Sequence, residues 1–155
     1  FPAGCALDDR AHDITYRRCV MEGFQQWRAG AYWNGDGFSC EPENRGIVYE
    51  ECAARGSTDG GFDCKSRDVV LRRCVAEDNK RNFRIWSARA LMQECLSRSP
   101  NFRGVGEEDT SPCHIWIGGE GARVRIEGLV IEEPSAETAL FEIDDEEARV
   151  ELSGL

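Results

Sequence analysis

A short phrase that contains one cysteine occurs four times in this 155-residue chain and constrains the fold more than any other feature. In its clearest copy, Val69-Val70-Leu71-Arg72-Arg73-Cys74-Val75, apolar residues precede a charged pair, and a cysteine and another apolar residue follow. On an α-helix, the third residue lies three positions before the cysteine, so one stripe holds most of the apolar side chains. The cysteine would then point inward. The other copies span residues 14–20, 47–53 and 90–96.

The four copies predict four amphipathic helices, over residues 8–29, 43–55, 65–79 and 83–97. Gly30 and Gly56 follow the first two as helix terminators, and Pro100 closes the helical part. Whether residues 78–82 form a turn or continue one long helix is left open by the pattern. The helical region predicts a disulfide-stapled bundle of about four helices over residues 8–98.

Beyond Pro100 the hydrophobic period changes from 3.6 to 2, which is typical of half-buried strands. Alternation of this kind predicts strands at residues 114–117, 122–127, 139–143 and 148–152, with a four-residue hairpin loop at 144–147. A small antiparallel β-sheet over residues 114–153 is therefore expected after the bundle. The predicted fold class is α+β.

The charge divides the chain into two regions. The net charge is -10, but residues 105–155 carry 3 Lys+Arg and 14 Asp+Glu, whereas the preceding part is nearly balanced. This shift predicts a cysteine-rich helical domain over residues 1–104 and an acidic β-rich region over 105–155. Matching cysteine steps further suggest an internal repeat, with two four-cysteine modules at about 5–56 and 64–113.

Eight cysteines in a chain of this length predict disulfides and an oxidising compartment. No C-x-x-C pair is present, so neither a zinc site nor a thioredoxin-like motif is expected, and no metal or cofactor is predicted. In an antiparallel bundle, Cys19 would lie level with Cys52, and Cys64 with Cys95, which favours these two bridges. The predicted disulfide cysteines are Cys5, Cys19, Cys40, Cys52, Cys64, Cys74, Cys95 and Cys113.

The chain begins Phe1-Pro2-Ala3-Gly4-Cys5, as expected of a mature secreted protein whose signal peptide has been removed. No apolar run approaches the roughly 20 residues that cross a bilayer, so no membrane span is expected. We therefore predict an extracellular location.

Catalytic signals are sparse. His12-Asp13 resembles the His-Asp pair of secreted phospholipases, although the paired cysteines and the glycine-rich calcium loop of that family are missing. Residues 32–43 partly fit a calcium loop, but Tyr32 occupies the first ligand position and supplies no carboxylate. No catalytic residue is predicted.

An aromatic loop is the best binding candidate, because large rings around a glycine-rich tip supply contact area at low entropic cost. Its residues are Tyr32, Trp33 and Phe38, and the alternative is that Trp33 and Phe38 cap the core. A basic stretch over residues 64–89 could touch nucleic acid or a sulfated glycan, but the acidic region would compete for it, so nucleic acid is not the expected partner. Docking of that acidic region on the basic helices, and weak calcium binding by it, are both left open.

These features predict a non-enzymatic, secreted binding protein that acts on an extracellular protein partner. A carrier of a small apolar ligand between the helices is the second possibility, and a calcium-dependent hydrolase the third. A homodimer is compatible with the pattern.

Overall fold

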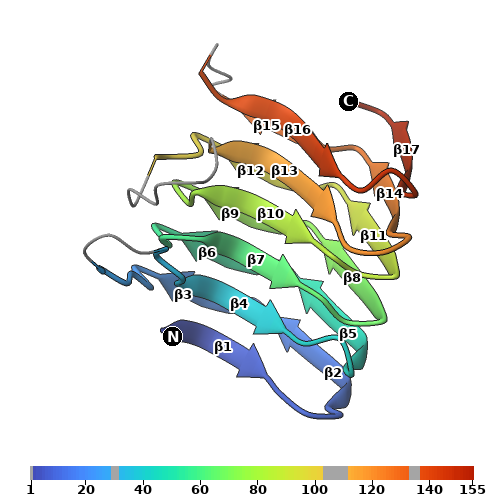
Figure 1. The fold of residues 1–155 in the computed structure, drawn as a ribbon, viewed down its shortest axis with the longest axis horizontal. Coiled ribbons are helices and arrows are strands. Elements are labelled where there is room, and N and C mark those ends of the chain that lie inside the picture. The colour runs from blue at the N-terminus through green and yellow to red at the C-terminus, as the bar shows by residue number, and fades with distance from the viewer. Residues whose placement is uncertain (1, 29–31, 103–111, 133–136) are drawn as a thin grey trace.

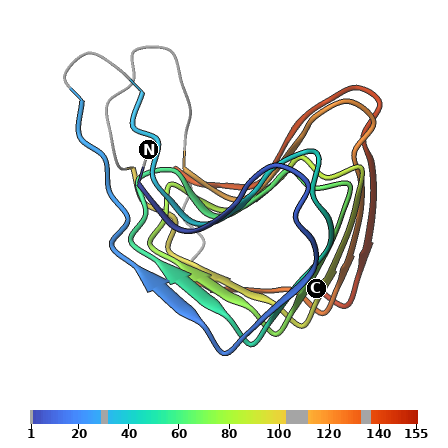
Figure 2. The same cartoon turned by 90° about the horizontal axis from the view of Figure 1, so that it is seen from below.

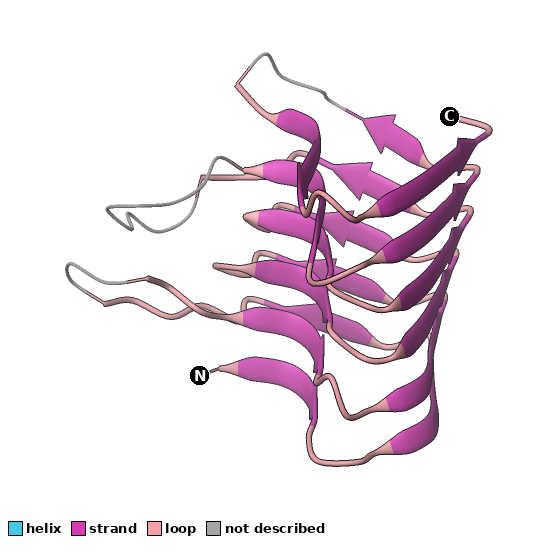
Figure 3. Cartoon of the chain, turned by 45° about the vertical axis from the view of Figure 1, so that its right-hand side comes forward, coloured by secondary structure: helices cyan, strands magenta, loops and turns pink. Residues whose placement is uncertain are grey.

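The structure is a computed structural model that describes residues 2–28, 32–102, 112–132 and 137–155, and these residues contain strands and no helix (Figure 3). The strands run in chain order as β1 (Ala3–Leu7), β2 (His12–Arg17), β3 (Val20–Glu22), β4 (Asp36–Cys40), β5 (Arg45–Glu50), β6 (Ala53–Arg55), β7 (Gly60–Cys64), β8 (Asp68–Arg72), β9 (Val75–Glu77), β10 (Arg81–Ile85), β11 (Arg89–Gln93), β12 (Leu96–Arg98), β13 (Cys113–Gly118), β14 (Arg123–Glu127), β15 (Val130–Glu132), β16 (Ala139–Asp144) and β17 (Arg149–Ser153). The predicted bundle over residues 8–98 is therefore wrong.

The strands form three parallel sheets that wind around one core. Sheet A is β1-β4-β7-β10-β13-β16, sheet B is β2-β5-β8-β11-β14-β17, and sheet C is β3-β6-β9-β12-β15. Each strand pairs with the strand three positions earlier in the chain, so successive coils stack on one another (Figure 1). Each of the first five coils supplies one strand to each sheet, and the sixth supplies strands to sheets A and B. This is a parallel β-helix. We number the coils 1 (β1–β3), 2 (β4–β6), 3 (β7–β9), 4 (β10–β12), 5 (β13–β15) and 6 (β16 and β17).

The cysteine phrase is one strand, one corner and the start of the next strand. Val69 and Leu71 of β8 point inward, and Arg72 points outward. Arg73 then takes a left-handed conformation with φ of 50°, which turns the chain so that Cys74 points into the core. The equivalent corners at Arg18, Glu51 and Glu94 have φ between 52° and 54°. Gly128 occupies the same corner in coil 5.

The helical interpretation failed because this corner mimics a helical stripe. Inward positions at the first, third and sixth residues of the phrase arise from alternation on a strand followed by a left-handed turn. The composition of the phrase pointed to strands, since Ile14-Thr15, Ile47-Val48 and Val69-Val70 are β-branched pairs. A reading by side-chain shape would have favoured the correct element.

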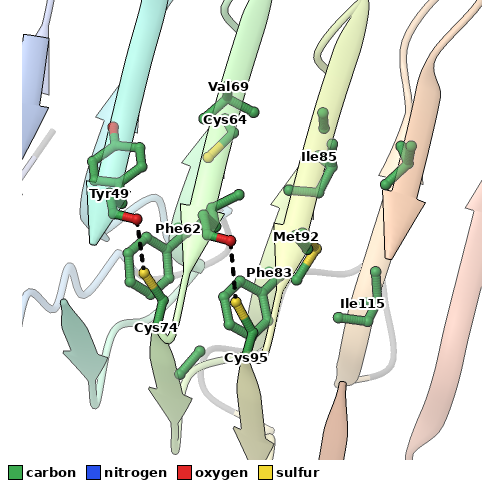
Figure 4. Packing of buried hydrophobic residues seen from close by; sticks show 14 of the residues in the cluster. Tyr49, Phe62, Cys64, Val69, Cys74, Phe83, Ile85, Met92, Cys95 and Ile115 are labelled. Atoms are coloured by element: carbon green, nitrogen blue, oxygen red, sulfur yellow. Dashed lines mark hydrogen bonds between the residues drawn. The ribbon is translucent and has the colours of Figure 1, made fainter. Parts of the chain in front are cut away.

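The core is a set of ladders in which equivalent residues of successive coils stack (Figure 4). The rings of Phe38, Phe62 and Phe83 stack at centroid distances of 4.9 and 5.3 Å. Tyr16 stacks on Tyr49 at 5.4 Å, and the Tyr49 ring meets Phe62 edge to face. Such stacking rewards the in-register pairing of the coils.

All eight cysteines carry free thiols, so the predicted disulfides, including Cys19–Cys52 and Cys64–Cys95, are not formed. Six of the eight are buried. The corner cysteines donate their S–H groups to the preceding coil: Cys74 Sγ lies 3.4 Å from the Tyr49 carbonyl oxygen, and Cys95 Sγ lies 3.6 Å from that of Leu71 (Figure 4). Cysteine acts here as a small apolar residue with a weak donor. The cysteines therefore give no support for an oxidising compartment.

Alternating charges on the outer face of sheet C support the same register. The last residues of its strands form the row Glu22, Arg55, Glu77, Arg98 and Glu132. Arg55 Nε lies 3.3 Å from Glu77 Oε2, and Arg98 Nε lies 2.6 Å from Glu132 Oε2. These ion pairs require that the last residues of successive strands lie opposite one another, as they do in this register.

Buried amides hold the corner between sheets C and A. The Asn79 side chain accepts from the Ser57 backbone N–H at 2.9 Å and donates to the Ala54 carbonyl at 3.0 Å. The Asn82 amide donates to Ser97 Oγ at 2.9 Å. The two Asn79 bonds satisfy backbone groups where the sheet ladders are interrupted.

After residue 113 the predicted strand positions are confirmed by β13, β14, β16 and β17, but their predicted antiparallel pairing is wrong. β16 and β17 belong to different sheets, and the loop at 144–147 is a corner between them. The predicted boundary between residues 104 and 105 lies outside the described residues. Strands from both sides of it pair in all three sheets.

Candidate functional site on the outer face of sheet A

The outer face of sheet A carries a group of polar and aromatic side chains that contact one another. Asp63, Arg84 and Trp116 are register partners on β7, β10 and β13. They point outward because the residues on either side of each, such as Phe62 and Cys64, point into the core. We call the A-face cluster the following residues: Asp36, Asp59, Asp63, Lys65, Arg81, Arg84, Trp86 and Trp116.

Asp59 is the centre of this cluster. Its Oδ1 accepts from Arg81 Nη1 at 2.8 Å, and its Oδ2 accepts from Arg84 Nη1 at 2.8 Å. Asp59 and Arg81 are almost completely buried, and Arg84 is 15% exposed. Charged groups removed from water in this way depend on each other, because loss of one leaves the others uncompensated.

Asp63 connects the Asp59 network to side chains that follow the C-terminal ends of the sheet A strands. Its Oδ1 accepts from Trp86 Nε1 at 2.9 Å, and its Oδ2 lies 2.8 Å from Lys65 Nζ. Burial raises the pKa of Asp63, while Arg84 and Lys65 oppose the rise. Burial acts to lower the pKa of Lys65, but the carboxylates of Asp63 and Glu41 outweigh it and raise that pKa. Lys65 is thus held in its charged form.

Asp36 is the third buried carboxyl group. Its Oδ1 accepts from the Gly60 backbone N–H at 2.7 Å, whereas its Oδ2 has no hydrogen-bond partner among the described residues. Burial, followed by the charges of Asp63 and Asp59, raises the pKa of Asp36 to about 8. Asp36 is therefore mostly protonated at neutral pH, next to carboxylates that are held by cations.

Two tryptophans cover the cluster toward the corner after sheet A. The Trp86 and Trp116 rings lie 4.4 Å apart between centroids, and the Arg84 guanidinium lies 4.4 Å from the Trp86 centroid. Trp116 folds over Gly118, where an added Cβ would lie 2.1 Å from its ring. The glycine therefore lets the indole lie flat against the sheet.

Aromatic residues also line the corner between sheets C and A, at the start of the sheet A strands. Chain connections project there beside the bowed sheet A (Figure 2). Tyr32 Oη accepts from Arg81 Nη1 at 2.9 Å, so the ring is tied to the cluster. Trp27 is 72% exposed, and its ring lies 6.4 Å from that of Trp33. Phe102, 59% exposed, follows β12 at the same corner of coil 4. This corner presents exposed rings beside a buried polar network.

The three residues predicted for binding therefore have different places. Tyr32 contacts the A-face cluster, and Trp33 belongs to the aromatic corner, where its Nε1 donates to the Arg28 carbonyl at 2.7 Å. Phe38 lies fully buried in the core ladder. His12 and Asp13 do contact each other, with Nδ1 and Oδ2 2.8 Å apart, but both side chains are more than half exposed at the start of β2.

Several cluster residues had no individual sequence signal. Asp63 and Arg84 are 21 residues apart, the same step that separates Cys74 from Cys95, so the coil length was present in the repeat. Interpreted as the circumference of a coil, this step would have placed the two residues side by side. The basic stretch over residues 64–89 divides accordingly. Lys65, Arg81 and Arg84 face outward from sheet A, and Arg72 and Arg89 from sheet B.

Among the described residues, no group of three or more His, Cys, Asp and Glu side chains is arranged to hold a metal ion, and no helix is long and apolar enough to cross a membrane. Comparison with protein-family models, curated proteins and solved structures finds no match for this chain.

Proposed function

We propose that this protein is a binding protein that holds a carbohydrate chain against the outer face of sheet A. The observation that carries the proposal is the convergence of tryptophans, paired carboxylates and paired cations on one face of a rigid β-helix. Binding sites are often concave and mostly apolar, with a few fixed polar groups. This face has the fixed polar groups, and the aromatic corner supplies the apolar surface.

Sugar hydroxyls both donate and accept hydrogen bonds, so they suit a surface on which donors and acceptors alternate at short range. The accessible edge of the network offers Glu41, Lys65 and Arg84, whose side chains are 32%, 23% and 15% exposed. Their mutual ion pairs fix the side chains before a ligand arrives, which lowers the ordering cost of binding. An exposed indole such as Trp27 offers a flat apolar face to the C–H groups of a sugar ring.

A protein ligand for the same corner is the second candidate. Trp27 and Trp33 are large rings at a projecting connection, and such residues dominate the energetics of protein interfaces. This retains the expectation of a non-enzymatic role with a protein partner. The predicted carrier depended on a cavity between helices, and the described residues form strands around a filled core instead. Secretion stays a prediction.

The proposal is tested by affinity electrophoresis through gels that contain single soluble polysaccharides, followed by calorimetry with the one that retards the protein. Trp27→Ala and Lys65→Ala should each weaken binding by about tenfold, the loss of one good contact. Val130→Ala, an exposed apolar change on the outer face of sheet C, is the matched control and should leave binding unchanged.

The two candidates give different outcomes. Loss of carbohydrate binding in both Trp27→Ala and Lys65→Ala supports the proposal, since Lys65 lies in the polar network and Trp27 in the aromatic corner. Absence of retardation by neutral, acidic and sulfated polysaccharides alike would overturn it. A protein ligand whose capture depends on Trp27 but not on Lys65 would favour the second candidate.

A further inference from the structure

The outer face of sheet B is not part of the A-face cluster. Its charge pattern is complementary to its own pattern when the order of the coils is reversed. Its strands stack along one side of the molecule (Figure 1). The central row of outward residues, from coil 1 to coil 6, is Thr15, Val48, Val70, Leu91, Arg125 and Glu151. Val48, Val70 and Leu91 are half-buried, so three apolar side chains in succession form a stripe at the middle of the face.

The row beside this stripe changes sign along the molecule. It consists of Asp13, Gly46, Asp68, Arg89, Arg123 and Arg149, in coil order. Carboxylates therefore lie in coils 1 and 3, and arginines lie in coils 4, 5 and 6. This row is acidic at one end and basic at the other.

The row on the other side of the stripe is satisfied internally. Its residues are Arg17, Glu50, Arg72, Gln93, Glu127 and Ser153. Arg17 donates to Glu50 at 2.7 Å, Arg72 to Gln93 at 3.0 Å, and Gln93 to Glu127 at 2.7 Å. Across the three rows, six arginines face five carboxylates, although the whole chain has a net charge of -10. The face is thus close to neutral on an acidic molecule.

We propose that the outer face of sheet B is the interface of a two-fold symmetric dimer of this chain. A two-fold axis parallel to the strands reverses the order of the coils and lets each row meet its own counterpart. Val70 of one protomer then faces Leu91 of the other, and Asp13 faces Arg149. Asp68 faces Arg89, and these two side chains already pair within one chain, with Arg89 Nη2 3.5 Å from Asp68 Oδ2. Self-complementary contacts of this kind are what an isologous interface requires.

The same operation leaves few unfavourable pairs. Glu50 meets Glu127, but Glu50 already pairs with Arg17, and Glu127 Oε1 lies 2.7 Å from Arg125 Nη2. Two β-sheets can pack face to face at about 10 Å with their strands nearly aligned, so side chains of the size of Val70 and Leu91 fill the space between them. The occupant of this face is thus a second copy of the chain, because the order of charges along the face is complementary to the reversed order on that copy.

Sedimentation velocity of the full chain across a concentration series tests the interface. The wild type should form dimers, and Val70→Lys should raise the dissociation constant by more than about tenfold, because its ammonium group would be buried against Leu91 of the other protomer without a counter-charge. Val130→Lys, an equally drastic change on the outer face of sheet C, should not alter it. Circular dichroism on each variant confirms that the fold is retained.

A charge swap gives a result that misfolding cannot imitate. Asp13→Arg and Arg149→Asp should each weaken the dimer, and the double variant should restore it, since Asp13 of one copy again faces an opposite charge at residue 149 of the other. The proposal is overturned if the wild type stays monomeric at the highest concentration reached. It is also overturned if Val70→Lys dimerises like the wild type, or if the double swap fails to recover what the single swaps lose.

Discussion

Replacement of Asp36 by Asn should remove a large part of the dependence of stability on pH. The pKa of Asp36 is raised from 3.8 to about 8, chiefly by burial and then by Asp63 and Asp59, while the Gly60 N–H and Arg84 oppose the rise. Between these two pH values the folded protein binds a proton at Asp36 that the unfolded chain does not hold. The free energy of unfolding therefore decreases as pH rises through this interval.

The magnitude follows from the width of the interval. At about 1.4 kcal/mol per pH unit, the range from 3.8 to about 8 corresponds to roughly 6 kcal/mol. The contribution of Asp36 is complete below pH 4 and lost above pH 8. The Asn variant carries no titrating proton at this position and keeps an oxygen that can accept from the Gly60 N–H. Its free energy of unfolding relative to that of the wild type should therefore increase by several kcal/mol from pH 5 to pH 8.

Urea unfolding followed by far-ultraviolet circular dichroism, at pH values from 5 to 9, measures this difference directly. Glu146→Gln, at an exposed carboxylate, is the control for the loss of one negative charge and should follow the wild-type curve. Parallel curves for the wild type and Asp36→Asn across this range would refute the reasoning, because Asp36 would then have similar pKa values in both states.

Three further changes test the fold. Phe62→Ala should lower the free energy of unfolding by about 3 to 5 kcal/mol in a urea titration, because it interrupts the ring ladder between Phe38 and Phe83, and a loss below about 1 kcal/mol would contradict the ladder. Glu94→Gly should stabilise by up to about 1 kcal/mol in the same assay, because it relieves a left-handed corner that Gly128 occupies in coil 5, and a destabilisation would contradict this. Gly118→Ala should shift the tryptophan emission and lower the melting temperature, because its Cβ would displace Trp116, and an unchanged spectrum would place that indole elsewhere.

The repeated phrase shows how much of the fold could be predicted. It was correctly identified as the structural unit, with its cysteine inward, yet its period was assigned to a helix. Apolar positions one, three and six are compatible with both elements when a left-handed residue intervenes. A left-handed Arg73 or Glu94 has no signature in sequence, since such conformations are uncommon outside glycine.

The candidate site shows a different limit. Tyr32 and Trp33 were recognisable because clustered aromatics in a glycine-rich loop are conspicuous. Asp59, Asp63 and Arg84 are ordinary residues individually, and only stacking of coils 3 and 4 makes them one network. The cysteines were misinterpreted for a related reason, since their number indicated disulfides while their use is that of small core residues with a weak donor.

The sequence by itself determined the local properties: which residues alternate, which face of each strand is apolar, and where charges of opposite sign recur at the length of a coil. These properties depend on neighbours within a few residues, where side-chain shape and backbone geometry act directly. Only the tertiary structure decided that the coils stack in parallel and that Asp59 meets two arginines from the next coil. Such pairings close loops of twenty or more residues, and their stability comes from ladders and ion pairs that exist only once the coils are assembled.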